Sequence, residues 1–489
     1  MMRQLRSTIG LILSIVTLIS AAAAAATSAP NLYNFEPTWE NLHYTRSIDL
    51  NRGYVKETDL IDIKNIASAP QSDYYYTIND GFNSVGNISY IDVVPIDSAI
   101  DIGLEEIVPS QVYKLKLPAP VAPGSNIELE VNFVYANKLE PIPKKIKLDE
   151  VQQLLYKTNK FPFSPYFTKD YTLVLTGMTK GQEMQLALDD LPDVVESQNT
   201  PDLKPRVDKD TLKYGPLVHD IEPFTLKPMG LMYDHNRPMT KVLNLNRSIW
   251  IPASDINRVS IEEYYEITNT GAELSSGFSR LEWLKGKYEA TRNHWALSHL
   301  EIPLKNRNLD DYYYTDKVGV VSSSKNIANF LILQPRFPLF GNWHYNFTLG
   351  WSENLDLFLH KSSSSSSSSA AAAAANEYIL KFPLLNTVRD ATYDDVYIDF
   401  YLPEGAEFDH VDSLLPYESV AVDYELSYLD VSKGHVKVTV HFKNLFDDLH
   451  KLDLFLTYRY NRTNLWVKVG KIAGFVFVGL VSYYLLNIL

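Results

Sequence analysis

The stretch Ile127–Tyr135 (IELEVNFVY) alternates apolar and polar side chains. Successive side chains of a β-strand point to opposite faces of the sheet, so this alternation predicts a strand with one buried face. Val112–Leu117 (VYKLKL) has the same pattern, and a loop rich in Pro and Gly follows it. Val396–Leu402 and Val436–Phe442 repeat the pattern later in the chain. The sequence therefore predicts a mainly β protein built from antiparallel sheets.

Helical signals are few in this part of the chain. The clearest lies at Leu148–Tyr156, where Leu148, Val151, Leu154 and Leu155 would share one face of a helix. We expect a short helix there.

A weak long-period repeat indicates two similar domains. Val55–Asn65 (VKETDLIDIKN) aligns with Val259–Asn269 (VSIEEYYEITN), and Asp73–Thr77 (DYYYT) recurs at Asp311–Thr315. Chance clustering of tyrosines is the alternative, because the chain holds 32 of them. We predict two tandem β-sandwich-like domains, at 29–230 and 231–460. A Ser/Ala tract at 361–376 reads as a surface loop in the second.

The ends of the chain predict a secretory protein with a membrane anchor. Residues 1–28 place Arg3 and Arg6 before an apolar run and then an alanine run, the order typical of a cleaved signal peptide. Retention of that segment as a signal anchor is the alternative. Residues 465–489 form a second apolar run, long enough to cross a bilayer as one helix. The body between them is then expected in the lumen or outside the cell.

The charges beside the C-terminal span disagree with that topology. Arg459, Arg462, Lys468 and Lys471 lie on its predicted lumenal side, opposite to the positive-inside tendency. A tail-anchored protein with a cytosolic body would fit these charges, but it would leave the signal-like N-terminus unexplained.

Composition narrows the class of function. The formal net charge of −14 argues against a nucleic-acid-binding surface, which needs a basic stripe. The chain has no cysteine, so thiol catalysis and zinc–thiolate sites are excluded. No HExxH, GxSxG or phosphate-binding Gly-rich motif is present. Asp208-Lys-Asp210 has a spacing that some sugar transferases use for a metal, but its polar, Pro/Lys-rich setting favours a loop. We predict no catalytic, metal or cofactor site.

Modification and packing motifs remain as the candidate site residues. Asn87, Asn246 and Asn346 open N-x-[ST] sequons and are predicted to carry N-linked glycans on exposed loops or strand ends. Asn461 also opens a sequon but lies too close to the span for modification. In the span, Gly470, Gly474 and Gly479 predict a face for close packing of a partner helix.

Several segments taken together resemble the ribophorin I family. They occur in the family's order at Trp39–Leu50, Val134–Pro143, Ser164–Tyr166, Tyr214–Pro216, Pro335–Trp343 (PRFPLFGNW) and Leu402–Ala406 (LPEGA). The family supplies a non-catalytic subunit of the oligosaccharyltransferase of the endoplasmic reticulum, which transfers a preassembled glycan from dolichol pyrophosphate to Asn of N-x-[ST]. The resemblance implies two lumenal β-rich domains, similar to the β domain of certain metallopeptidases, and one membrane helix. Animal members of the family continue into a cytosolic region after this helix; the sequence given stops at Leu489, and the resemblance is to a short, fungal form.

The resemblance also implies the location and partners. We expect a type I protein of the endoplasmic reticulum membrane that assembles with the multi-spanning catalytic subunit and small membrane subunits. Nascent polypeptides and membrane lipid are further expected contacts. A cell-surface adhesion or receptor protein with a single span is the alternative function, and a free-standing glycan- or peptide-processing enzyme is a weaker one.

Overall fold

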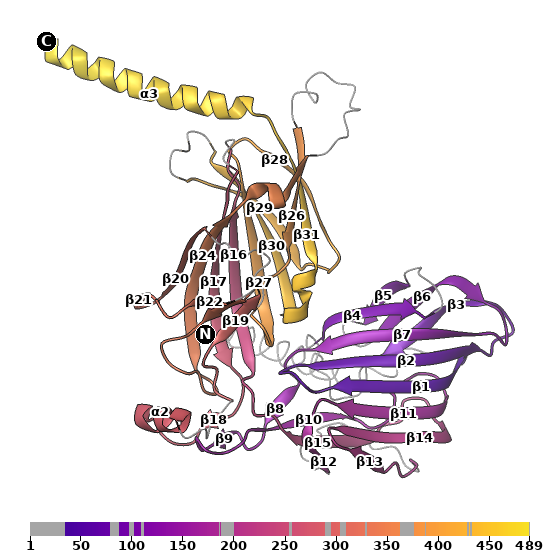
Figure 1. Cartoon of the computed structure of the whole chain (residues 1–489). Helices are drawn as coiled ribbons and strands as arrows, with labels where there is room; N and C mark the ends of the chain where they lie inside the picture. The colour runs from indigo at the N-terminus through magenta and orange to yellow at the C-terminus, as the bar shows by residue number, and fades with distance from the viewer. Residues whose placement is uncertain are drawn as a thin grey trace, which may run out of the picture.

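The computed structural model describes residues 35–78, 88–96, 102–108, 112–184, 186, 200–253, 257–288, 295–303, 310–327, 330–361, 376–386, 388–427, 430 and 433–488 (Figure 1). The predicted signal peptide lies outside these residues, as does most of the Ser/Ala tract. In the described part the protein is mainly β, as predicted, and ends in one long helix.

The first large sheet has seven strands and comes from the N-terminal half of the chain. In spatial order they are β13 (Pro205–Asp208), β14 (Thr211–Ile221), β11 (Thr168–Thr176), β1 (Trp39–Asp49), β2 (Val55–Asn65), β7 (Asn126–Tyr135) and β4 (Ile88–Pro95). Two smaller sheets accompany it, ordered β12 (Thr179–Met184), β15 (Pro228–Asp234), β10 (Gln153–Asn159), β8 (Leu139–Pro141) and β3 (Gln71–Thr77), β6 (Val112–Val121), β5 (Gly103–Val108).

The second large sheet has eight strands and comes from the C-terminal half. Its order is β21 (Gly319–Val320), β20 (Asp310–Asp316), β24 (His344–Glu353), β17 (Val259–Asn269), β16 (Thr240–Trp250), β27 (Ala391–Leu402), β30 (His435–Phe446) and β29 (Ser419–Glu425). Its smaller sheets are β25 (Leu359–Lys361), β26 (Asn376–Pro383), β31 (Asp453–Tyr460), β28 (Glu407–Ser413) and β19 (Leu300–Pro303), β23 (Phe330–Leu333), β22 (Lys325–Ile327).

A few short elements complete the fold. They are the strand pair β9 (Lys145–Ile146) and β18 (Glu273–Leu274), the helix α2 (Arg280–Tyr288), the 3₁₀ turns η3 (Leu355–Leu357) and η5 (Asp447–Lys451), and the C-terminal helix α3 (Thr463–Ile488).

Each large sheet packs against its smaller sheets through a buried apolar layer. One core cluster draws on the first large sheet and on β3, β6, β10 and β15, and a second draws on the eight-stranded sheet, β26 and β31. This is the sandwich arrangement, in which alternating inward side chains of two sheets meet. Sandwich packing was predicted from the alternating strands. The boundary near residue 230 stays a prediction.

The two large sheets share one topology. Each contains a parallel pair in the same place, β1 with β11 and β16 with β27. The order β13-β14-β11-β1-β2-β7-β4 matches β29-β30-β27-β16-β17-β24-β20 strand for strand. The two predicted repeat segments are β2 and β17, which occupy equivalent places in this order. The first repeat match is thus confirmed.

The asparagines at the ends of these two strands make equivalent hydrogen bonds to loop carbonyls in the two halves. Asn65 donates from its side-chain amide to the carbonyl oxygens of Ala69 and Val121 at 3.0 and 2.8 Å. Asn269 donates to two loop carbonyls at 2.9 and 3.0 Å. Each amide therefore holds the loops at the end of its sheet by satisfying backbone groups there.

The second repeat match is wrong. Asp73–Thr77 forms most of β3, which pairs with β6 in a small sheet, whereas Asp311–Thr315 lies in β20 beside β24 in the large sheet. The topological partner of β20 is β4, which pairs with β7 as β20 pairs with β24. The two Tyr runs are chance clusters.

The predicted helix at Leu148–Tyr156 is also wrong. Most of its second half is the strand β10, which pairs with β15 on one side and β8 on the other. Leu154 and Tyr156 are fully buried in the sandwich core. Hydrogen bonding on both edges, together with burial of these two side chains, outweighs the weak helical spacing.

A buried polar network lies inside the first sandwich. The Tyr44 and Tyr76 hydroxyls both donate to Oδ2 of Asp59 at 2.6 Å, and Arg46 pairs with Glu57 next to them. Burial and the neighbouring Glu57 carboxylate raise the pKa of Asp59 to about 7, against a smaller lowering by Arg46 and the two hydroxyls. The same place in the second sandwich holds the buried pair Arg247 and Glu263.

Candidate functional site

The two halves of the chain are joined around one buried carboxylate. Asp447 is 4% exposed and accepts hydrogen bonds from the Tyr54 hydroxyl, from Arg52 Nη1 at 2.6 Å and from the backbone N–H of Asp390 at 2.9 Å. The ring of Tyr54 packs against that of Phe446, with centroids 5.4 Å apart. This contact fixes the turn between β1 and β2 against the end of β30.

A second contact lies at the other side of the junction. The side-chain oxygen of Gln152 accepts from the backbone N–H of Ala272 at 2.8 Å, and its amide donates to the carbonyl of His235 at 3.0 Å. The strands β9 and β18, one from each half, pair in parallel beside it. The halves are therefore held at two places with a gap between them.

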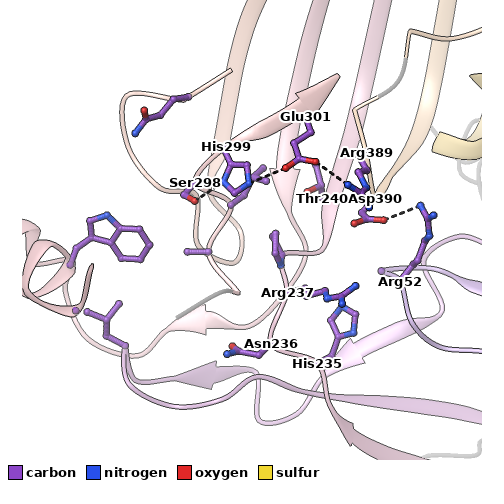
Figure 2. A pocket seen from close by; sticks show the side chains of 18 of the residues that line it. Arg52, His235, Asn236, Arg237, Thr240, Ser298, His299, Glu301, Arg389 and Asp390 are labelled. Carbon is purple, nitrogen blue, oxygen red and sulfur yellow. Dashed lines mark hydrogen bonds and ion pairs between the residues drawn. The ribbon is translucent and has the colours of Figure 1, made fainter. Parts of the chain in front are cut away.

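A cavity of about 780 Å³ occupies this gap. This volume is within the range of ligand pockets in proteins. Loops and the helix α2 line most of it, and Thr240 of β16 and Glu301 of the edge strand β19 complete the wall (Figure 2). Its polar lining comprises Asn51, Arg52, His235, Asn236, Arg237, Thr240, Glu282, Ser298, His299, Glu301, Gln334, Arg389 and Asp390, with Trp283 as its aromatic member.

The charged groups of the cavity are largely paired with one another. Arg52 lies 2.9 Å from Asp390, and Arg389 lies 3.2 Å from Glu301, as the dashed lines in Figure 2 show. Asp447 and Asp448 add further carboxylates beside Arg52. The third arginine of the lining, Arg237, makes no ion pair with a described carboxylate, and its Nη1 lies 3.5 Å from Oδ1 of Asn51.

Two polar atoms of the cavity wall have no partner. Nε2 of His235 and Oδ1 of Asn236 are buried and make no hydrogen bond, and His235 is 6% exposed. Burial, with a smaller contribution from the charge of Arg237, lowers the pKa of His235 to about 4, so the imidazole is neutral at pH 7. A buried polar atom without a partner costs about 1–3 kcal/mol.

The C-terminal helix α3 leaves the second sandwich as an isolated rod (Figure 1). None of its residues is buried, and it is long and apolar enough to cross a membrane. Its first turns are tied to the body: Asn464 donates to the Gly405 carbonyl at 2.9 Å, and Lys468 pairs with Glu404 at 3.2 Å and with Asp430. The charge of Lys468 is thus neutralised within the protein, which weakens its conflict with the predicted topology.

The predicted packing glycines lie along this helix. Gly470, Gly474 and Gly479 have open space where a side chain would stand. Gly470 and Gly474 are one helical turn apart and share a face. Their role in helix packing stays a prediction.

The structure places two predicted glycan carriers on one sheet face. Asn246 lies in the centre of β16 opposite Tyr264, and Asn346 lies in β24 and donates to the Tyr264 hydroxyl at 3.1 Å. Both asparagines are half-buried. The expectation of loops or strand ends is therefore wrong for Asn246, whereas Asn346 is the third residue of β24 and lies near the start of that strand. The modification of both stays a prediction. Asn87 lies outside the described residues.

The acidic motifs lie apart from the cavity. Asp208 and Asp210 flank the exposed turn between β13 and β14, as the loop interpretation predicted. Among the described residues, no group of three or more His, Asp or Glu side chains is arranged to hold a metal ion.

Sequence reasoning missed the cavity. Its residues come from at least five separate loops, from α2 and from the strands β16 and β19, and none belongs to a recognisable motif. The one local signal was the segment His235–Pro238, a polar, Pro-containing link between the two sandwiches.

Comparison with known proteins gives one consistent result. The profile of the family described as Ribophorin I matches residues 39–487. A Caenorhabditis elegans protein named dolichyl-diphosphooligosaccharide–protein glycosyltransferase subunit 1 is 26% identical over 436 residues, covering 87% of this chain and 68% of its own. Subunit 1 of the same enzyme from Schizosaccharomyces pombe is 24% identical, and the match covers 92% of this chain and 95% of that protein. Subunit 1A from Arabidopsis thaliana is 24% identical, and the match covers 86% of this chain and 65% of that protein.

A solved structure matches more distantly. Leukotriene A4 hydrolase from Saccharomyces cerevisiae covers 45% of this chain and 32% of its own at 8% identity, with a TM-score of 0.27. At this TM-score the match says nothing about function, and the likeness to a metallopeptidase β domain stays a prediction.

Proposed function

Because the chain belongs to the ribophorin I family, we propose that it is a non-catalytic subunit of the oligosaccharyltransferase complex of the endoplasmic reticulum membrane. That complex transfers a preassembled glycan from dolichol pyrophosphate to Asn of N-x-[ST] in nascent proteins. The observation that carries the proposal is the match of the family profile over residues 39–487, which includes both sandwiches and nearly all of α3. The relatives' names do not support the adhesion or receptor alternative.

The proposed role is to hold the complex together and to present a lumenal surface near the active site. The multi-spanning catalytic subunit and small membrane subunits are the proposed partners. The exposed helix α3 suits contact with lipid and with their helices. The ties from Asn464 and Lys468 to the body support this role, because they set the direction in which the second sandwich leaves the membrane surface.

Nascent polypeptide is the proposed contact of the edge strand β29. This strand ends the eight-stranded sheet, so one row of its backbone groups faces away from the sheet. Val422 and Tyr424 are 45% and 58% exposed, and Leu426 follows at 70%. An unpaired edge with apolar side chains can accept an extended peptide as an added strand.

The assembly proposal is tested by affinity purification of the full chain in mild detergent, followed by an assay of glycan transfer to an acceptor peptide. Transfer activity should co-purify with the chain. Gly474→Leu should reduce the yield of small membrane subunits, because the leucine blocks close approach of a partner helix. Val476→Leu is the matched control, since it changes an apolar position about 200° around the helix. Purification of the chain without transfer activity would refute the proposal.

The nascent-chain proposal is tested by site-specific photo-crosslinking. A crosslinker at Tyr424 should capture nascent chains during translation. The same crosslinker at Val207, which is 70% exposed on the edge strand β13 of the other sandwich, is the control. Equal capture at both positions would show that β29 has no special role.

The body is proposed to lie in the lumen. A lumenal body predicts glycans at Asn87, Asn246 and Asn346, and each Asn→Gln variant should then migrate faster on a gel by one glycan. Unchanged mobility after glycosidase treatment of the unaltered chain would count against this orientation.

A further inference from the structure

We propose that the end of β29 contacts the phospholipid headgroup layer beside α3 and gives the protein a second membrane contact. Leu426, which is 70% exposed, comes directly after β29. Lys468 joins the first turns of α3 to the same part of the body. The inference rests on the membrane crossing of α3 proposed above, but not on which side of the membrane the body lies.

The sequence of α3 sets the depth of Lys468 in the membrane. The stretch Ile472–Ile488 has no charged residue, so its start marks where the hydrocarbon core begins. Lys468 lies about one helical turn earlier, which places it about 6 Å above the core. The headgroup layer on each side of a bilayer is about 5–8 Å thick. The exposed indole of Trp466 lies nearby, and Trp is enriched at this level of membrane helices. Lys468 therefore lies in the headgroup layer.

The side chain of Lys468 holds the end of β29 at the same level. Its ammonium pairs with Asp430 and with Glu404 at 3.2 Å, and both carboxylates are almost completely buried. Asp430 also fixes the turn that follows Leu426. Its Oδ2 accepts from the backbone N–H of Ser427 at 2.8 Å, and its own N–H donates to the Ser427 carbonyl at 3.1 Å. Leu426 is therefore next to a turn that is bonded to the helix in the headgroup layer.

The side chains exposed at this level suit a lipid surface. Leu426 is apolar, and the exposed Lys433 lies close by, with its Nζ 5.4 Å from the centre of the Tyr424 ring. Lys471 is exposed on α3, about 60° around the helix from Lys468. A leucine gains by entering the boundary between headgroups and acyl chains, while lysine ammoniums stay at the phosphates. Because none of the residues of α3 is buried, lipid is the expected surrounding at this depth.

Leu414 offers a matched control position. It is 79% exposed and follows β28, whose first residue, Glu407, pairs with Arg459 shortly before α3 begins. From Glu407 to Ser413 the strand leads away from that end by about 20 Å, at roughly 3.4 Å per residue. Leu414 is therefore as exposed as Leu426 but lies at the opposite end of the sandwich.

The test uses the full chain in nanodiscs and single cysteines, which the cysteine-free sequence allows. A fluorescent probe is attached in turn to Leu426→Cys, Leu414→Cys and Val478→Cys. The nanodiscs contain lipids with a nitroxide quencher either on the headgroup or deep in the acyl chain. The probe at Leu426 should lose most of its fluorescence to the headgroup quencher, and the probe at Val478 should lose most to the deep quencher. The probe at Leu414 should keep its fluorescence with both.

A second pair of variants tests the leucine itself. The probe is moved to Lys433→Cys, and Leu426→Asp is added. This change should weaken the membrane contact about tenfold, seen as a loss of quenching by the headgroup lipid, because the contact no longer buries an apolar side chain. Leu414→Asp in the same background is the control and should leave the quenching unchanged.

The quenching pattern separates this inference from the membrane crossing of α3. Quenching at Val478 without quenching at Leu426 overturns the inference and leaves α3 as a membrane helix, and equal quenching at Leu426 and Leu414 overturns it too. A probe at Leu426 that stays unquenched in nanodiscs but is shielded from water in the co-purified complex would assign the surface to a protein partner instead. The absence of quenching at Val478 would refute the membrane crossing and this inference with it.

Discussion

Replacing Asp447 by Ala should loosen the junction between the two sandwiches. The change removes the acceptor for the hydroxyl of Tyr54, a residue that is 1% exposed, and for the backbone N–H of Asp390. Each buried donor left without a partner costs about 1–3 kcal/mol. Arg52 keeps Asp390 at 2.9 Å, so its charge is not left alone. We therefore expect a loss of about 2–3 kcal/mol, below the roughly 3–5 kcal/mol for breaking a fully buried ion pair.

Native-state hydrogen exchange measures this loss directly. The amide of Asp390 is one of the donors to Asp447, so its exchange reports opening of the junction. A loss of 2–3 kcal/mol corresponds to exchange that is about 30- to 150-fold faster, while amides in β2 and β17 should change little.

A double-mutant cycle supplies the control. Tyr54→Phe removes the donor instead of the acceptor and should cost about 1 kcal/mol, because it leaves no buried donor unpaired. The double variant should cost less than the sum of the single variants, since the two groups share one hydrogen bond. Additive effects, or exchange at Asp390 that changes less than about threefold, would refute the reasoning.

Other predictions concern stability and the membrane anchor. The folded-state pKa of Asp59 lies near 7, above its ordinary value, so the native state binds more protons than the unfolded state between about pH 4 and 7. The free energy of unfolding therefore falls as pH rises through that window. Asp59→Asn should remove this slope in denaturant titrations, and an unchanged slope would contradict the assignment. Lys468→Met leaves the fully buried carboxylate of Asp430 without its main partner and should cost about 3–5 kcal/mol locally. Faster hydrogen exchange in the first turns of α3 would measure this loss. Unaltered exchange there would show that the ion pair does not hold the helix. Gly341→Ala places a Cβ 2.3 Å from two backbone carbonyl oxygens and should cost about 1–3 kcal/mol in thermal unfolding. Gly277→Ala places its Cβ in open space and should cost less than Gly341→Ala. Equal losses would refute the steric argument.

The sequence predicted the architecture where local pattern and tertiary environment agree. Ile127–Tyr135 alternates because its apolar side chains face one core, so β7 was found to within one residue. Leu148–Tyr156 misled because its leucines suit a helix and a two-sided buried strand equally well, and only pairing with β15 and β8 decides between them. In the repeat, the closing asparagines Asn65 and Asn269 carried real information, since both satisfy loop carbonyls.

The candidate site could not be read from the sequence for a different reason. His235 and Asn236 look like ordinary linker residues, and Arg389 and Glu301 are 88 residues apart along the chain. Their meeting depends on how two folded sandwiches dock, and no local periodicity records that. The segment Pro335–Trp343 shows the opposite case. It contributes to the family resemblance, and its Gly341 touches the backbone of the neighbouring turn, which leaves no space for a side chain.

The parallel strand pairs have a consequence for biosynthesis. Asn41 in β1 pairs with Thr168 in β11, 127 residues later in the chain. The strands β16 and β27 of the second parallel pair are separated by a stretch of similar length. At about 5–20 residues per second, translation needs roughly 6–30 s to deliver each missing strand. During that interval β16, with Asn246 at its centre, has one open edge as the chain emerges. A predicted glycan acceptor that is half-buried in the finished sheet is therefore accessible while the ribosome is still completing the chain.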